Sequence, residues 1–464
     1  MDKLIYASAT ALARAIRYKE VSSTEVVEAH LRRIEEVNPR LNAVVLLTGD
    51  RALAEAREAD AALARGEVKG PLHGVPMTIK DALDTEGVIS TGGTLGRAAF
   101  VPKEDATVVK RLRDAGGIML GKTNLPELSL FWECDNLIHG RCNNPYDLTR
   151  GPGGSSGGEA AIIAAGGSPF GIGSDAGGSI RQPAHYCGIA GIKPTSGCVP
   201  RTGHFRPPGG IQDFRNQVGP LARYVEDLIL VLPIIAGPDS RDPAIVPGSL
   251  GDPQAVELKG LRVSFHTDNG MASPTPETAE AVRRAAQCLA DAGAQVEESL
   301  PDDIGQVQEI YSRLRRLSGR SEIRRVLDDI GTREVHPFTR KWQESLSDSS
   351  ASAEEIFDCI AEWDAFRGSM LSYIQDYDVI LSPVCAEPAL PYGQTMDADK
   401  LPGFSYVMWY NLTGWPGVAV RGGTSPEGLP IDIQVGSGAW RDHVALAAAR
   451  HIESVLGGWQ PPPL

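Results

Sequence analysis

Two serines set in glycine-rich segments are the residues of this chain whose types and spacing most favour chemistry. One segment reads Gly151-Pro-Gly-Gly-Ser-Ser-Gly-Gly158 and the other Gly173-Ser-Asp-Ala-Gly-Gly-Ser-Ile-Arg181, with no histidine between them. Glycine lets a loop bring its N–H groups close to a ligand, so such loops stabilise an oxyanion or hold a phosphate. The serines favour the oxyanion and predict a nucleophile that does not use histidine.

Lys80 is the candidate base for such a nucleophile. A serine hydroxyl attacks a carbonyl poorly unless an adjacent base takes its proton. A lysine accepts a proton only when it is neutral, which requires burial or nearby positive charge to lower its pKa from ~10.4. Because Lys80 follows the apolar segment Val75-Pro-Met-Thr-Ile79, we expect its side chain to be buried.

Several motifs together make the chain resemble the amidase signature family of serine hydrolases. The resemblance is dense over residues 70–239, and residues 411–416 and 428–434 are similar to the family's C-terminal elements. One departure is Ile431-Asp432, where a small residue commonly occupies the second position, and we expect altered packing there. The motifs are Gly70-Pro-Leu-His-Gly-Val-Pro-Met-Thr-Ile-Lys-Asp81, the two glycine and serine segments, and Gly188-Ile-Ala-Gly-Ile-Lys-Pro194.

The resemblance implies a catalytic triad of Lys80, Ser155 and Ser179. In it Ser179 attacks, Lys80 is the base, and Ser155 relays the proton between them after a cis peptide bond. The remaining predicted site residues contribute backbone N–H groups to an oxyanion hole, support the loop, or bind substrate. They are Ala176, Gly177, Gly178 and Ser179 for the hole, Asp175, Arg181 and Ser156 for support, and Ser129 and Ser155 for substrate.

The elements that position these residues alternate between helix and strand. Ser22-Ser-Thr-Glu25 has capping-box spacing and predicts a helix at 23–37, and the small residues after Ser155 predict another at 157–165. We interpret residues 170–173 as too glycine-rich for an ordinary strand. The other predicted helices are 51–65, 107–115, 277–292, charged helices within 302–370, and 441–456, and the predicted strands are 75–79, 118–120, 261–265, 379–383, 417–420 and 431–435.

This alternation predicts an α/β fold, a single large domain with a central mixed β-sheet covered by helices on both faces. Within residues 1–464 we distinguish three parts of that domain. They are the signature core at 70–239, a variable and mostly helical elaboration at 240–376, and C-terminal strands and a helix at 377–464 that complete the core.

Composition limits the partners. The net charge of −14 disfavours direct nucleic-acid binding. The seven cysteines are scattered and lack paired spacing, which argues against a disulfide framework or a zinc site. No apolar run approaches the ~20 residues that span a bilayer, and the N-terminus lacks a signal-peptide pattern, so we expect a cytoplasmic protein. We expect no cofactor or metal, and the sequence leaves a homodimer open.

Two rival motifs fit less well. Gly153-Gly-Ser-Ser-Gly157 matches the G-x-S-x-G nucleophile elbow, but the residues before it read as loop, and that pattern needs a strand there. Gly171-Ile-Gly-Ser-Asp-Ala176 matches a loose dinucleotide loop without its βαβ context or its later acidic residue. The histidines show no metal-binding spacing.

We therefore predict an amidohydrolase that acts on a small-molecule amide through a Ser179 acyl-enzyme. The alternative is the glutaminase subunit of a tRNA-dependent amidotransferase, which the signature residues do not separate from it. A catalytically dead binding protein is disfavoured because no triad position is replaced. The aromatics Trp409, Tyr410, Trp415 and Trp132 belong either to the core or to an apolar pocket, and they favour an apolar-leaning substrate.

Overall fold

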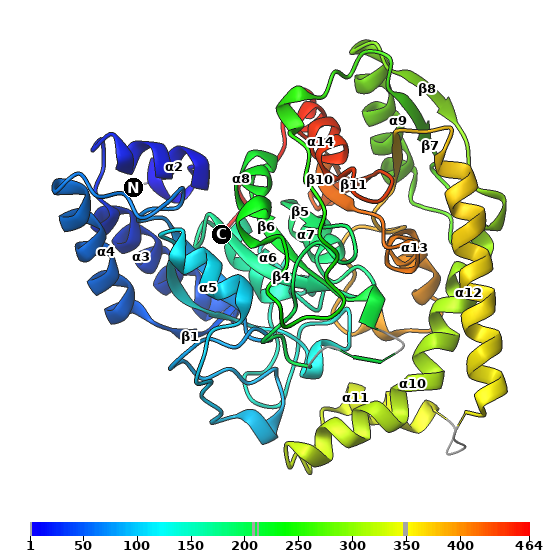
Figure 1. Ribbon diagram of the computed structural model, residues 1–464, viewed down its shortest axis with the longest axis horizontal. Helices are drawn as coiled ribbons and strands as arrows, with labels where there is room; N and C mark the ends of the chain where they lie inside the picture. Colours follow the sequence, from blue (N-terminus) through cyan, green and yellow to red (C-terminus); the bar gives the residue numbers. More distant parts are fainter. Residues whose placement is uncertain (1, 207–208, 211–212, 347–350) are drawn as a thin grey trace.

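The computed structural model describes residues 2–206, 209–210, 213–346 and 351–464, and within them one mixed β-sheet of eleven strands forms the centre of the protein (Figure 1). Across the sheet the strands follow the order β1-β3-β2-β4-β6-β5-β10-β11-β9-β7-β8. The strands are β1 Val44–Leu47, β2 Pro76–Lys80, β3 Ile118–Thr123, β4 Phe170–Asp175, β5 Ala190–Lys193, β6 Gln217–Ala222, β7 Arg262–Phe265, β8 Gln295–Glu298, β9 Val379–Pro383, β10 Gly417–Thr424 and β11 Pro430–Gly436.

The α-helices lie before, between and after these strands. In Figure 1, α2 to α5 gather at one end of the molecule, and α10 and α12 run side by side at the other. The helices are α1 Asp2–Ile5, α2 Ala9–Arg17, α3 Ser23–Leu41, α4 Gly49–Ala64, α5 Thr107–Asp114, α6 Gly157–Ala164, α7 Arg181–Cys187, α8 Val225–Ile235, α9 Pro276–Asp291, α10 Val307–Asp329, α11 Pro337–Ser345, α12 Ala353–Ile374, α13 Ser405–Thr413 and α14 Asp442–Leu456.

The sheet has apolar side chains on both faces. In β10, Val418 and Val420 join one buried hydrophobic cluster, whereas Ala419 between them joins a second. Because successive side chains of a strand point to opposite faces, the two clusters lie on opposite sides of the sheet. Helices therefore cover both faces, and the predicted single α/β domain with a mixed sheet is confirmed.

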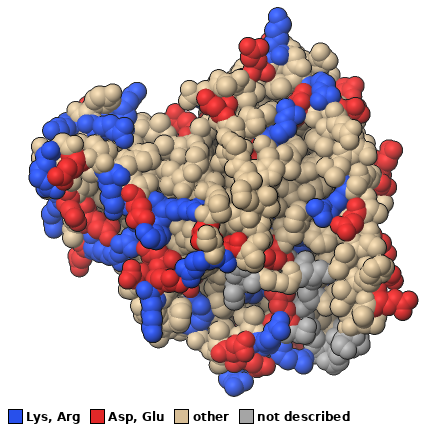
Figure 2. Space-filling view, in the orientation of Figure 1, with Lys and Arg blue, Asp and Glu red and all other residues tan. Residues whose placement is uncertain are grey.

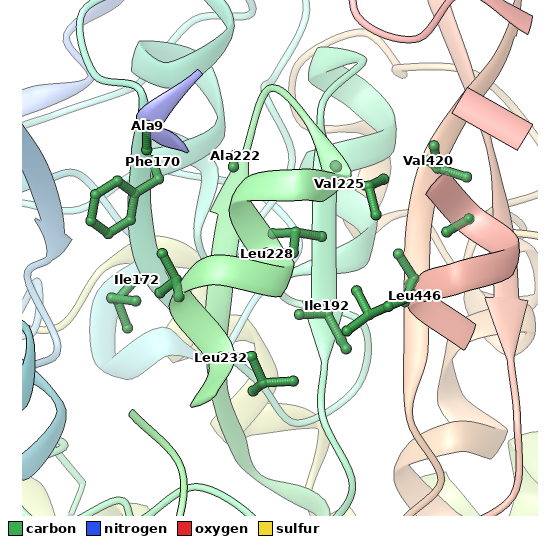
Figure 3. Close-up of a cluster of buried hydrophobic side chains, with 14 of the residues drawn as sticks. Ala9, Phe170, Ile172, Ile192, Ala222, Val225, Leu228, Leu232, Val420 and Leu446 are labelled. Carbon is green, nitrogen blue, oxygen red and sulfur yellow. The ribbon is translucent and has the colours of Figure 1, made fainter. Parts of the chain in front are cut away.

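Figure 3 shows one of these clusters around helix α8. Val225, Leu228 and Leu232 of this helix lie among Phe170, Ile172, Ala222 and Ile192 of the central strands, and Leu446 of α14 and Val420 of β10 belong to the same cluster. These side chains are at most 3% exposed, so their burial contributes directly to stability. One of these strands, β4, leads into the second glycine-rich segment, and the core thereby fixes where that loop begins.

Most predicted elements are present. The capping box at Ser22 and Glu25 forms and begins α3, and α6 begins at Gly157, directly after the first serine pair. The charged segment 302–370 contains α10, α11 and α12, apart from residues 347–350, which lie outside the described residues. The strands β1, β5, β6 and β8 were not predicted, because each is short or interrupted by glycine, proline or charge.

The interpretation of residues 170–173 is wrong, because β4 Phe170–Asp175 is a strand in the middle of the sheet. Its glycines allow neighbours to approach closely. A Cβ at Gly171 would lie 1.5 Å from Glu159 Oε1, and one at Gly173 would lie 2.6 Å from Ser156 Oγ. The glycines thus make room for the side chains of α6 and the first serine segment.

Asp432 stands where the amidase signature family commonly has a small residue. Its side chain is fully buried in β11, and within the described residues neither carboxyl oxygen has a hydrogen-bond partner. Burial raises the pKa of this carboxyl well above its usual range, against the opposing charge of Arg421. The backbone N–H of Asp432 donates to Nδ1 of His185 at 2.8 Å, which links β11 to α7.

The surface carries charges of both signs. Figure 2 shows Lys and Arg interspersed with Asp and Glu over the end that holds α2 to α5, so this view displays no broad field of one sign. Of the helices in the described ranges, none is both long and apolar enough to cross a bilayer.

We expect Leu228→Ala to lower the free energy of unfolding by about 2–5 kcal/mol, because it removes buried methyl groups and leaves a cavity in a packed core. Leu371→Ala on α12 is the matched control, since Leu371 is 54% exposed and should cost well under 1 kcal/mol. Chemical denaturation monitored by circular dichroism measures both. Equal losses for the two variants would contradict the packing described for α8.

Candidate active site

Lys80 ends β2, which lies between β3 and β4 and runs parallel to both. Its side chain is fully buried, and Nζ donates to Ser155 Oγ at 2.6 Å, Ser174 Oγ at 3.0 Å and Ser156 Oγ at 3.1 Å. Burial lowers the pKa of Lys80 to about 7, although Asp175 and Glu159 oppose this shift. The amine is thus uncharged in a large fraction of molecules near neutrality.

Ser155 lies within the first glycine segment, two residues before α6 begins at Gly157. The Gly154–Ser155 peptide bond is cis, as the resemblance implied. Gly154 leaves no space for a side chain, since a Cβ there would lie 2.6 Å from the carbonyl oxygen of Phe131. Its N–H donates to Gln182 Oε1 at 2.9 Å. These contacts hold the Ser155 hydroxyl against the lysine amine.

Ser179 lies in the loop after β4 and is 9% exposed. Its carbonyl oxygen accepts a hydrogen bond from the N–H of Ser156 at 3.2 Å, so the two serine segments are in direct contact. Within the described ranges, no hydrogen bond joins the hydroxyls of Ser155 and Ser179. A serine hydroxyl rotates freely, and catalytic hydrogen bonds often tighten only when substrate binds.

Ser174 and His204 complete the surroundings of the lysine and were missed from the sequence. His204 Nε2 lies 3.0 Å from the Ser174 hydroxyl that contacts Lys80. Burial and the nearby Lys80 lower the pKa of His204 to about 3, so the ring is neutral. Ser174 stands inside the second glycine segment and could have been noticed, whereas no spacing pattern marks His204.

The Asp175–Arg181 ion pair supports the loop that carries Ser179. The pair is fully buried, with Arg181 Nη2 3.0 Å from Asp175 Oδ1. Burial alone would raise the pKa of Asp175, but Arg181 and the surrounding donors hold it well below its usual range. Asn411 of α13 donates to Asp175 Oδ1 at 2.9 Å, and Gln434 of β11 accepts from Arg181 at 2.7 Å. The C-terminal elements thereby reach the loop.

The four predicted oxyanion-hole residues differ in the state of their N–H groups. The Gly178 N–H donates to Asp175 Oδ1 at 2.7 Å, so in this structure it is engaged in loop support. Within the part of the chain that the structure describes, the N–H groups of Ala176, Gly177 and Ser179 have no recorded acceptor. Trp132 Nε1 donates to the Gly177 carbonyl at 2.9 Å and fixes the orientation of that peptide.

A pocket opens beside this loop. Ser129 and Trp132 line it together with Ala176, Gly177 and Ser179. Ser129 Oγ is buried and has no partner among the described atoms, which suits a group that meets a ligand. The other lining residues are Leu130, Phe131, Arg206, Arg215, Tyr311, Arg315, Glu322, Ile323 and Trp342.

The aromatic cluster at residues 409–415, in and just after α13, does not belong to this pocket. Trp409, Tyr410 and Trp415 are at most 2% exposed and join the hydrophobic core. Trp409 stacks edge-on against both of the others. Of the two places expected for these aromatics, the three residues lie in the hydrophobic core, whereas Trp132 lines the pocket.

The seven cysteines are free and buried. Across the described residues, no group of three or more His, Cys, Asp or Glu side chains is arranged to hold a metal ion.

Comparison with known proteins agrees with the geometry. Residues 25–446 match the model of the Amidase family. This chain belongs to the amidase family. It is 33% identical to the acylamidase of Rhodococcus erythropolis over 98% of this chain and 96% of that protein. It is also 35% identical to a glutamyl-tRNA(Gln) amidotransferase subunit of Heliobacterium modesticaldum, over 90% of each.

Solved structures of family members have the same fold. 6-aminohexanoate cyclic dimer hydrolase superposes with a TM-score of 0.87 at 28% identity, covering 97% of each chain. A bacterial aryl acylamidase superposes with a TM-score of 0.85 at 26% identity, covering 97% of this chain and 96% of that one. The resemblance predicted from the sequence motifs is confirmed.

We expect Gly178→Ala to lower the free energy of unfolding by about 1–3 kcal/mol, because its φ of +104° disfavours a side chain and a Cβ would lie 2.4 Å from Val407 Cγ2. Gly368→Ala is the control, since nothing lies within 4 Å of its Cβ and it stands inside helix α12. Denaturant titration should show no loss for Gly368→Ala. A stable Gly178→Ala protein would contradict the loop geometry.

Proposed function

We propose that this amidase-family chain is an amidohydrolase that cleaves carboxylic amides through an acyl-enzyme on Ser179. The observation that carries the proposal is the buried Lys80 amine, 2.6 Å from Ser155 Oγ and with its pKa lowered to about 7. A base of this kind is matched to proton transfer at neutral pH. The similarity to acylamidase and to other amide hydrolases supports the same reaction.

The reaction proceeds in two halves. Ser179 Oγ attacks the amide carbon while its proton passes to Ser155, and Ser155 gives its own proton to Lys80. The tetrahedral intermediate then expels the amine or ammonia, which takes a proton back from Lys80 through Ser155. An ester between Ser179 and the acyl group remains. Water attacks this ester with the same proton route, and the carboxylic acid leaves.

The backbone of the loop would stabilise the oxyanion. The N–H groups of Ala176, Gly177 and Ser179 are the candidate donors, and each such donor typically contributes about 3 kcal/mol of transition-state stabilisation. Gly178 instead supports the loop through Asp175. Ser156 and Arg181 support the loop, Ser156 through its N–H bond to the Ser179 carbonyl and Arg181 through Asp175. Ser129 is the candidate to contact substrate in the pocket.

The partners and location remain predictions that agree with this role. We propose a small-molecule amide as substrate, no cofactor, no direct nucleic-acid contact and a cytoplasmic location. A homodimer stays open.

A second candidate function is the glutaminase subunit of a tRNA-dependent amidotransferase. The similarity to the glutamyl-tRNA(Gln) amidotransferase chain of Heliobacterium modesticaldum favours it. The two functions differ in their need for partners. Purified chain that hydrolyses simple amides alone supports the amidohydrolase, whereas hydrolysis of glutamine only in the presence of further subunits supports the second candidate.

We expect Ser179→Ala and Lys80→Met to lower kcat/KM for amide hydrolysis at least about a thousandfold, because each removes one member of a unit that acts together. Release of ammonia or amine is the measurement, and a fluorophosphonate should label the wild-type protein but not Ser179→Ala. Ser372→Ala, on the exposed side of α12, is the matched control and should retain full activity. Normal hydrolysis by folded Ser179→Ala would refute the assignment.

We expect kcat/KM for an uncharged amide to fall about tenfold per pH unit below pH 7 and to level off above it, because Lys80 must be neutral and its pKa is about 7. Glu159 also has its pKa raised to about 7 by burial, so Glu159→Gln separates the two groups. Removing that negative charge should shift the inflection to lower pH without abolishing it. If the inflection in kcat/KM disappears in Glu159→Gln, the group that titrates near pH 7 is Glu159 and not Lys80.

A further inference from the structure

Charged groups of mostly one sign line the pocket beside Ser179. Among the described residues that line it are three guanidinium groups, those of Arg206, Arg215 and Arg315, and one carboxylate, that of Glu322. The whole chain carries a net charge of −14. A cationic pocket in an acidic protein attracts anions locally, because low-dielectric walls concentrate the field of its charges.

Aromatic rings hold two of these arginines. The Arg215 guanidinium lies 4.5 Å from the ring centre of Tyr311 and donates to the carbonyl of Ala176 at 3.4 Å. Arg315 lies 5.4 Å from the ring centre of Trp342 and 5.9 Å from that of Trp132. Stacking of this kind orients the plane of a guanidinium and leaves its edge suited to a planar oxyanion.

Arg206 is the arginine that pairs with the carboxylate of the pocket. Its Nη1 lies 3.0 Å from Glu322 Oε1, and both side chains are about one quarter exposed. Among the described lining residues, three positive charges thus face one negative charge. Like charges that share one pocket repel one another, and burial together with Arg315 lowers the pKa of Arg215. An anion bound among them would relieve that repulsion.

We infer that the preferred substrate is an amide that carries a carboxylate or similar oxyanion away from the bond that is cleaved, and that Arg206, Arg215 and Arg315 bind this group. The inference rests on the proposed amidohydrolase function and specifies its substrate class. Arginine pairs with carboxylates through two parallel hydrogen bonds, which gives both affinity and orientation. Trp409, Tyr410 and Trp415 lie in the core and give no support to an apolar-leaning substrate, whereas Trp132 lines the pocket beside the arginines.

The test compares amides that differ only in charge. Monoamides of dicarboxylic acids, from malonamate to adipamate, place the carboxylate in the acyl part, and alkanamides of matched length are the neutral partners. N-acetylglycine and N-ethylacetamide make the same comparison for the amine part. We expect kcat/KM to be at least about tenfold higher for one anionic series than for its neutral partners, the range that hydrogen bonds to charged groups give.

Substitutions assign the effect to the pocket. Arg315→Gln should lower kcat/KM for the anionic amides about tenfold and for the neutral amides less than about twofold. Arg316→Gln is the matched control on the same helix, because Arg316 is exposed and pairs with Glu309 at 3.0 Å. It should change neither series. If Arg315→Gln does not fold, Arg206→Gln replaces it, with a larger expected loss because Glu322 is left to repel the anion.

Binding without turnover gives an independent readout. In Ser179→Ala, calorimetry should show tighter binding of the best anionic amide than of its neutral partner, and added salt should weaken only the former. Equal affinities and equal kcat/KM values for both series would overturn the inference, as would an equal loss for both in Arg315→Gln. If either of these results is obtained but hydrolysis of neutral amides still requires Ser179, the amidohydrolase function is retained and only the inference about anionic substrates is rejected. Hydrolysis that is independent of Ser179 would instead remove the proposed function.

Discussion

Lys80 keeps its amine in the interior of the protein with hydroxyl groups as partners, and the rest of the site depends on that burial. Within the described ranges, no carboxylate oxygen lies within 4 Å of its Nζ. Lys122 on the adjacent strand β3 is equally buried but lies 3.9 Å from Asp81 Oδ1, and burial lowers its pKa only to about 8. A close carboxylate would keep Lys80 charged, so the ring of serines and the neutral His204 preserve its basic form.

The Asp175–Arg181 pair explains why the loop that carries Ser179 depends on elements far away in the sequence. A buried ion pair costs desolvation energy that the pair recovers only with good geometry and further hydrogen bonds. Asn411 and Gln434 supply such bonds from α13 and β11. The loop is therefore positioned by the last quarter of the chain as well as by β4.

The sequence predicted what local motifs encode and missed what tertiary contact creates. Lys80 and the serine segments were found because each stands in a dense run of glycine, serine and apolar residues. The strand β4 was misread because glycine normally weakens strands, whereas here it accommodates Glu159 and Ser156. His204 could not be found, because its approach to Ser174 arises only when residues distant from β4 fold back over it. The aromatic run 406–415 was ambiguous for the same reason, since burial in a core and lining of a pocket favour the same residue types.

The pocket combines two parts of the chain with different roles. Residues 70–239 contain Lys80 and the serine segments, whereas α10, in the helical elaboration, carries Tyr311, Arg315 and Glu322 to the pocket wall. A change on α10 can therefore alter the wall of the pocket without touching the lysine or its hydroxyl partners. Arg206 and Arg215 come from the core itself, however, so the positive charge of the pocket does not depend on α10 alone. The helix instead sets how that charge is oriented, since Tyr311 and Glu322 contact the two core arginines directly.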